Sequence, residues 1–515
     1  MSHARPLATA VRGRHTARAA ARIPAAPFTA DTAIGCAVAV GFCVYLARMT
    51  GASHWALVVL GICGAIEAPT LVRWLRGKTD AFDPKSIVTL LVFHNTFVAP
   101  ALHLLWDWYT PMVRVPQDPW EWFGRLALIN VGALVCFEAA YRRTVARPAP
   151  LRPVLRIRSS RLALALALGA VVALAAQVKL LQHFGGPAGL IEAYEARSDQ
   201  FEGMGLFLVL AWPFPLIALL EGLIGLARFH VKPRGWMIGL LLACFAVLHL
   251  AWAGLHGSRL SMLGGMFLAA GFCHFLVRRF RIRTVVIGVV AALLFSFVYS
   301  FYKGAGREGL SSALSGTGGL AQAEQRTGRD FGWLLLGDLA RADIQMEELW
   351  TMYDANPEYE LKLGGTYVGA ALFIPRSIWP TRPRGAQEAY AELQDGRIAV
   401  RDGDVPNSRV FGLTGETLLN FGWAGVPIAY AVFGILIGTV RRFIDSLRPG
   451  DARHLFVPLA VLLITALYLL DLSQVVFMLL QDCALLGTCT LVALWRPAPA
   501  RATSGRAMAA TARAA

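Results

Sequence analysis

Apolar residues occur along this chain in long runs that short polar connections separate. A helix needs about 20 residues to cross the hydrocarbon layer of a membrane, and twelve runs come close to or exceed that length. The pattern therefore predicts an all-α fold, a polytopic integral membrane helical bundle. The predicted spans cover residues 33–49, 54–72, 87–106, 123–141, 161–181, 205–227, 235–253, 259–277, 283–301, 423–440, 455–471 and 474–495.

The composition agrees with a membrane protein. Of the 515 residues, 56% are hydrophobic and only 16% are charged. A soluble domain of average composition carries about a quarter charged residues. This low charge content excludes an ordinary soluble enzyme.

The formal net charge of +16 would also suit a nucleic-acid-binding protein, so the positions of the basic residues decide its meaning. They cluster in alternate connections: seven arginines lie in 142–161, four in 278–283 and four in 441–453. Basic connections stay on the cytoplasmic side of a membrane. We therefore expect residues 1–32 and 496–515 to be basic cytoplasmic tails of a protein in the inner (cell) membrane, the first span to be uncleaved, and nucleic acid not to be a partner.

One connection is far longer than the others and should face the extracytoplasmic side. Residues 302–422 separate the first nine spans (33–301) from the last three (423–495), and they hold twelve basic and sixteen acidic residues. A loop of this length is usually functional. Within it, apolar residues spaced three and four apart over 339–353 predict an amphipathic helix that packs on the membrane domain or lies at its outer surface.

The segment GGTYVGAALFIPRSIWPTRPRG, residues 364–385, combines an apolar run with cations. The run is too short to span a membrane, and three prolines and three arginines follow it within 375–384. This pattern predicts a re-entrant or interfacial helix that ends by Pro375 and presents Arg376 and Arg382 at headgroup depth, beside the amphipathic ring of Trp379. The arginines would either bind a phosphate group of a ligand or anchor the loop to lipid headgroups.

The loop continues with a polar, hairpin-like insert (388–409) and then runs into the tenth predicted span. Glu416 and Asn420 stand one helical turn apart near the outer membrane face. Glu416 is either a general base or a partner of one of the arginines, and we favour the ion pair.

The short connection HGSR, residues 256–259, is expected on the same outer side. Arg259 departs from the general pattern, in which basic residues lie in the cytoplasmic connections. It is therefore a functional candidate. The alternative is that its side chain only reaches into the lipid headgroups. His256 would assist it or be a plain interfacial histidine. The chain has no HExxH or paired-cysteine zinc pattern, no phosphate-binding GxxxxGKS loop and no GxSxG elbow, so no metal and no cofactor are predicted.

Several of these patterns occur together in one known family. The GSR turn at 257–259, RAD at 341–343, GGTY at 364–367, IPRSIWPTRP at 374–383 and GETLLNFGWAGV at 415–426 follow one another in this order. The series resembles the Wzy-type oligosaccharide repeat-unit polymerases, relatives of O-antigen and capsule polymerases, over roughly 257–440. One departure is Arg382, where the family pattern has lysine before the last proline.

The resemblance implies a metal-independent glycosyltransferase with a helical bundle of the GT-C type. Its substrates would be two oligosaccharides linked to undecaprenyl diphosphate, in a membrane lipid environment, with a chain-length regulator protein as a further partner. Arg259 and Arg376 would bind the diphosphate with Arg341 and Arg382 as supports. Asp343, Glu416 or His256 would act on the acceptor hydroxyl, and Tyr367, Trp379 and Asn420 would contribute to substrate binding.

Two other functions remain open. An O-antigen ligase-like transferase, which moves finished glycan to another acceptor, uses a similar bundle and loop. A secondary transporter also suits twelve spans, although the two halves show no repeat.

Overall fold

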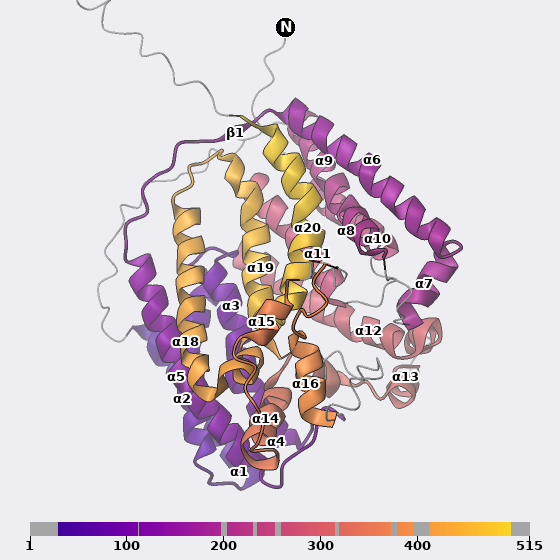
Figure 1. Ribbon diagram of the computed structural model, residues 1–515. Coiled ribbons are helices and arrows are strands. Elements are labelled where there is room, and N and C mark those ends of the chain that lie inside the picture. Colours follow the sequence, from indigo (N-terminus) through magenta and orange to yellow (C-terminus); the bar gives the residue numbers. More distant parts are fainter. Residues whose placement is uncertain are drawn as a thin grey trace, which may run out of the picture.

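The computed structural model describes residues 29–111, 113–196, 203–229, 234–252, 259–314, 319–371, 374, 378–395 and 411–495. Within these residues the protein is a helical bundle, and the predicted all-α membrane fold is confirmed (Figure 1). In the part of the chain that the structure describes, eleven helical stretches are long and apolar enough to cross a membrane. They are α1 (Ala30–Thr50), α2 (Ala56–Leu75), α3 (Pro84–Phe93) with η2 (His94–Val98) and α4 (Ala99–Trp106), α5 (Pro119–Val145), α6 (Ser159–His183), α8 (Gly205–Ala211) with most of α9 (Phe214–Phe229), α10 (Gly235–Trp252), the first part of α12 (Ile282–Tyr302), α18 (Gly412–Asp445), η7 (Ala452–Phe456) with α19 (Val457–Leu469), and α20 (Leu472–Ala493).

The remaining predicted span, 259–277, coincides with α11 (Arg259–Leu276), whose described side chains form a shorter apolar helix, Ser261–Leu276. Each of the twelve predicted spans thus lies on a helix. The chain is a multi-pass membrane protein.

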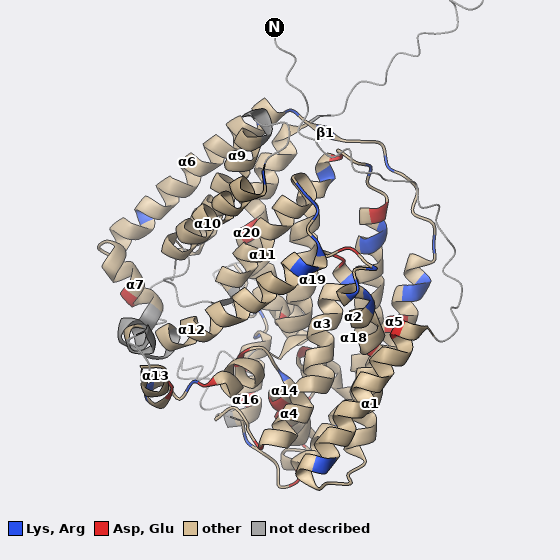
Figure 2. Ribbon diagram, turned by 180° about the vertical axis from the view of Figure 1, so that it is seen from behind, with Lys and Arg blue, Asp and Glu red and all other residues tan. Residues whose placement is uncertain are grey.

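The basic connections contact one another at one end of the bundle, which we call the basic end. Asp31 at the start of α1 pairs with Arg76 and Lys78 beyond α2. Asp83, just before α3, pairs with Arg441 near the end of α18. A two-residue strand after α5, β1 (Arg156–Ile157), pairs with β2 (Leu494–Trp495) beyond α20. Figure 2 shows Lys and Arg in several connections between helices, while other charged residues lie on the helices themselves.

The largest apolar core joins α2, α5 and α18 to the helices of the long loop. The helices α5 and α18 approach closely at Gly434, where an added Cβ would lie 2.5 Å from the Phe137 carbonyl oxygen. A second core lies among α6, α9, α11 and α20. Small residues at a membrane helix contact allow this closeness, and dispersion forces then stabilise it.

The long loop folds onto the other end of the bundle, which we call the loop end. Helix α12 (Ile282–Leu314) continues beyond its predicted end at residue 301. After it come α13 (Gly319–Thr327), η5 (Trp333–Asp338), α14 (Ala342–Trp350), η6 (Thr351–Ala355), α15 (Gly365–Gly369) and α16 (Ala386–Asp395).

The prediction of an amphipathic helix over 339–353 was wrong in one respect. Every residue from Ala342 to Leu349 in α14 is buried, polar ones included. The connection between α4 and α5 covers one side of α14, where the Thr110 hydroxyl donates to Asp343 at 2.6 Å. On another side, the Gln345 side chain donates to the Phe411 carbonyl oxygen at 2.7 Å. Because tertiary hydrogen bonds satisfy Asp343 and Gln345, these polar residues need no exposed face.

Two other predictions about the loop need correction. The helix predicted to end by Pro375 is shorter than expected, because α15 covers only the five residues Gly365–Gly369; its re-entrant or interfacial position stays a prediction. The polar insert at 388–409 begins inside α16, so its first part is helical, and 396–410 lie outside the described residues.

Helix α18 is divided at Gly422, which has φ 68° and ψ −170°. The break lies where the long loop was expected to meet the tenth span. The Trp423 backbone N–H donates to the Tyr353 hydroxyl at 3.2 Å, so a loop side chain caps the second half of α18. An added Cβ on Gly422 would lie 2.7 Å from that hydroxyl, so only glycine fits here.

Candidate functional site

Two of the motifs form one hydrogen-bonded unit, although about fifty residues separate them. The Asn420 side-chain oxygen accepts from the backbone N–H of Gly364 at 3.0 Å and of Thr366 at 3.3 Å. Its amide donates to the Thr366 hydroxyl at 2.6 Å and to the Glu416 carbonyl at 2.7 Å. We call this unit the 366–420 clasp. Asn420 is fully buried, and its three bonds to Gly364 and Thr366 fix the start of α15 against α18.

Glu416 extends the clasp to a third segment. One carboxyl oxygen accepts from the Thr366 hydroxyl at 3.0 Å, and the other accepts from the Leu472 backbone N–H at 2.8 Å, at the start of α20. The favoured prediction of an ion pair with an arginine does not fit this geometry. Among the described residues, the hydrogen bonds to Glu416 come from a hydroxyl and a backbone N–H. Its carboxylate therefore joins α15, α18 and α20.

A cavity of about 290 Å³ lies beside this junction. Arg382 is its cation, and its guanidinium donates to the carbonyl oxygens of Ala371 at 3.2 Å and Ile374 at 2.9 Å. These bonds hold the segment after α15 in place around the cavity. The lining residues are Gly369, Arg382, Gly385, Ala386, Gln387, Glu388, Asp471, Ser473, Gln474 and Phe477.

Asp471 is a lining residue that the sequence reasoning missed. It caps α20 by accepting from the Gln474 backbone N–H at 3.0 Å, and its other oxygen accepts from the Gln387 side chain at 3.1 Å. Burial raises the pKa of this carboxyl above its ordinary value, while these hydrogen bonds oppose the rise. The sequence feature that could have identified Asp471 is the position of an acidic residue between two apolar spans, at the end where the long loop lies.

Two aromatic candidates lie near the clasp and the proline-rich segment. The Tyr367 hydroxyl is 3.1 Å from the Thr417 hydroxyl, and burial raises the pKa of Tyr367 to about 12, so it stays protonated. Trp379 is half-buried, and the neighbouring Ile378 is 74% exposed. An exposed apolar residue beside a tryptophan suits contact with a lipid surface.

Arg341 and Asp343 lie away from this cavity. The Arg341 guanidinium donates to the carbonyl oxygens of Asp338 and Ala340 at 3.0 and 2.5 Å. Asp343 is fully buried and bonded to Thr110. The Arg341 backbone N–H donates to the Asn95 side-chain oxygen at 2.8 Å. This bond and the Asp343–Thr110 bonds fix the loop to the bundle, and neither residue is among those that line the cavity.

A second carboxyl lies behind the clasp. Glu348 in α14 is fully buried. Burial, together with the charges of Glu347 and Glu416, raises its pKa well above the ordinary value, while a contact with the Leu419 backbone opposes the rise. An added Cβ on Gly415 would lie 2.6 Å from a Glu348 oxygen, so glycine allows α18 to approach this carboxyl.

Arg259 is the first residue of α11, and the direction of this helix shows which end of the bundle it occupies. An added Cβ on Gly264 would lie 4.0 Å from Leu462, whereas one on Gly271 would lie 2.7 Å from Pro458. Helix α11 is therefore antiparallel to α19, and its first residue lies toward the C-terminal end of α19, where the cavity is.

The other two predicted residues of the site, Arg376 and His256, lie outside the described residues. Among the residues that the structure does describe, no cluster of three or more histidine, cysteine or acidic side chains is arranged to hold a metal ion.

Comparisons with protein families, with curated proteins and with solved structures found no match to this chain. Any function must therefore be argued from the motifs and from the geometry of the loop end.

Proposed function

We propose that this protein is a polymerase that joins oligosaccharide repeat units carried on a polyprenyl diphosphate at the extracytoplasmic face of the cell membrane. The observation that supports this most is the meeting of three separate segments at the loop end. The GGTY and GETLLN motifs form the 366–420 clasp, and Arg382 of the proline-rich motif lines the adjoining cavity.

The proposed reaction moves a glycosyl group between two lipid-linked chains. A hydroxyl oxygen at the non-reducing end of a new repeat unit attacks the anomeric carbon of the growing chain. The bond between that carbon and the diphosphate oxygen breaks, and the lipid diphosphate leaves with the bonding electrons. The hydroxyl proton passes to a carboxylate.

Cations at headgroup depth suit this leaving group. Guanidinium groups bind phosphate oxygens through paired hydrogen bonds and stabilise the negative charge that develops as the bond breaks. In this proposal Arg259 and Arg376 bind the diphosphate, and Arg382 holds the surrounding backbone.

Asp471 is the proposed base, because it lines the cavity and Asp343 does not. A raised pKa brings a carboxylate closer to neutral pH, where proton transfer is most efficient. Glu416 positions the walls of the cavity through its bonds to Thr366 and Leu472.

The proposal is tested by removing the protein from its own cell and separating the carrier-linked glycans by size. Single repeat units should accumulate, and the wild-type chain should restore a ladder of lengths. Arg259→Ala and Arg376→Ala should insert normally yet give no ladder, while Arg143→Ala at the basic end should restore it. Full-length carrier-linked polymer in the deleted cell would instead indicate a ligase, and failure of repeat units to reach the outer face would indicate a transporter.

A separate test concerns sidedness, because the mechanism requires the loop end to face outward. Single cysteines in place of exposed loop residues such as Glu360 should react with a membrane-impermeant thiol reagent in intact cells. A cysteine in place of exposed Arg448 should react only after lysis. The reverse result would contradict the proposed function.

A further inference from the structure

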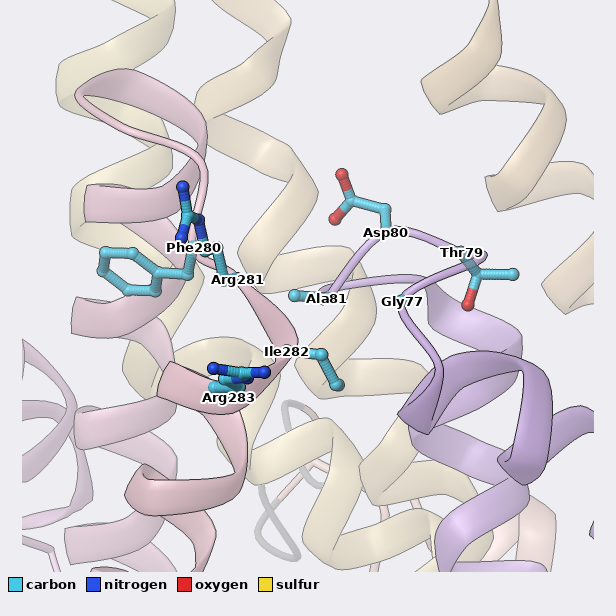
Figure 3. A pocket seen from close by; sticks show the side chains of 8 residues that line it. All are labelled: Gly77, Thr79, Asp80, Ala81, Phe280, Arg281, Ile282 and Arg283. Carbon is cyan, nitrogen blue, oxygen red and sulfur yellow. The ribbon is translucent and has the colours of Figure 1, made fainter.

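A second pocket, of about 320 Å³, opens at the basic end, away from the proposed site. Two segments face each other across it, the loop after α2 and the segment that starts α12 (Figure 3). The lining residues are Gly77, Thr79, Asp80, Ala81, Phe280, Arg281, Ile282 and Arg283. An added Cβ on Gly77 would lie 3.8 Å from the Ile282 side chain, so the two segments almost touch at this point.

Two arginines that line this pocket form no ion pair with another described residue. Arg281 and Arg283 are exposed, and within the described part of the chain neither forms an ion pair. Neighbouring basic residues behave differently. Arg279 pairs with Asp80 at 3.1 Å, and Arg441 pairs with Asp83.

The start of α12 adds further donors to the same pocket. The first N–H groups of a helix have no partner within the helix, and the helix dipole makes this end positive. The backbone N–H groups of Ile282 and Arg283 donate to no other described residue. Free N–H groups beside two guanidinium groups are a favourable arrangement for a phosphate.

The carboxylate in the pocket does not cancel these charges. The His274 Nδ1 accepts from the Phe280 backbone N–H at 2.9 Å, and its Nε2 lies 3.0 Å from both the Asp80 carboxylate and the Arg279 guanidinium. Burial by itself would raise the pKa of Asp80, but the bond from His274 and the charge of Arg279 lower it to about 2. Asp80 is thus ionised and already neutralised by Arg279, which leaves the two free arginines in excess.

We propose that this pocket binds the phosphate of an anionic phospholipid headgroup in the membrane leaflet at the basic end. Phe280, Ile282 and Ala81 supply an apolar wall for the glycerol and upper acyl carbons, while Arg281 and Arg283 bind the phosphate. Basic pockets between membrane helices commonly recognise anionic lipid in this way. The site is independent of the glycosyl-transfer proposal, because none of these residues belongs to the loop end.

The test uses the full chain in detergent and counts bound lipid by native mass spectrometry while phosphatidylglycerol is added. Arg281→Gln/Arg283→Gln should bind about 30-fold more weakly, the change that corresponds to about 1 kcal/mol for each arginine. A charge-matched control is Arg143→Gln/Arg448→Gln, which alters two exposed arginines outside the pocket. The control should bind like the wild type.

A second variant tests shape separately from charge. Ile282→Trp keeps the net charge but fills the pocket, and it should also lose phosphatidylglycerol. Phosphatidylcholine and inorganic phosphate serve as comparison ligands, and each should bind the wild type at least tenfold more weakly. Equal loss in the control double variant, unchanged binding by Ile282→Trp, or equal binding of either comparison ligand would each overturn the proposal.

Discussion

The four hydrogen bonds of Asn420 allow a quantitative prediction about the clasp. Asn420→Ala removes the acceptor for two backbone N–H groups and the donor to the Thr366 hydroxyl and the Glu416 carbonyl. Three of these bonds reach Gly364 and Thr366, so at about 1 kcal/mol for each buried bond the contact between α15 and α18 should weaken by about 3 kcal/mol. Since 1.4 kcal/mol is a factor of ten, the amides around α15 should open up to about 150-fold more often.

Hydrogen exchange measured by mass spectrometry on the full chain in nanodiscs detects this opening directly. Peptides that cover 362–370 should exchange much faster in Asn420→Ala, while peptides from α5 should not change. Asn130→Ala is the matched control, because Asn130 is also buried but its side-chain oxygen has no partner in the described residues. Unchanged exchange around α15, or the same acceleration there in both variants, would refute the reasoning.

Three further variants test the loop end. The pKa of Glu348 is raised, so the folded state holds this proton more tightly than the unfolded state does. The free energy of unfolding should therefore fall as the pH rises from 4.5, the ordinary pKa of a glutamate, toward the pKa of Glu348 in the folded state. Glu348→Gln should remove this part of the pH dependence in denaturation experiments. Gly422→Ala should lower the unfolding midpoint by the equivalent of about 2 kcal/mol or more, because the new Cβ would have a positive φ and would collide with the Tyr353 hydroxyl. Gly41→Ala, where nothing lies within 4 Å, should leave the midpoint unchanged, and equal effects of the two variants would contradict backbone strain at Gly422. Asp471→Asn should keep the α20 cap through its one remaining oxygen and lose the bond from Gln387, so the unfolding midpoint should fall by the equivalent of about 1 kcal/mol at most while polymer is abolished. A normal ladder of lengths would remove Asp471 from the mechanism.

The sequence determined the helical framework because each span must satisfy its own backbone hydrogen bonds and bury its own apolar side chains in lipid. These are local requirements, so hydropathy placed all twelve helices, and the clustering of arginines predicted which connections meet at the basic end. The same patterns singled out Glu416, Asn420 and Arg382 as polar residues in apolar surroundings.

Only the tertiary structure decided what those residues contact. Glu416 bonds to Thr366 and Leu472 because α20, far along the chain, brings a free N–H to it. Asp343 became a buried support, and Asp471 became a lining residue of the cavity, for the same reason. A polar side chain in an apolar run must find a partner, but its spacing in the sequence does not say which one, because that choice depends on how helices distant in sequence pack.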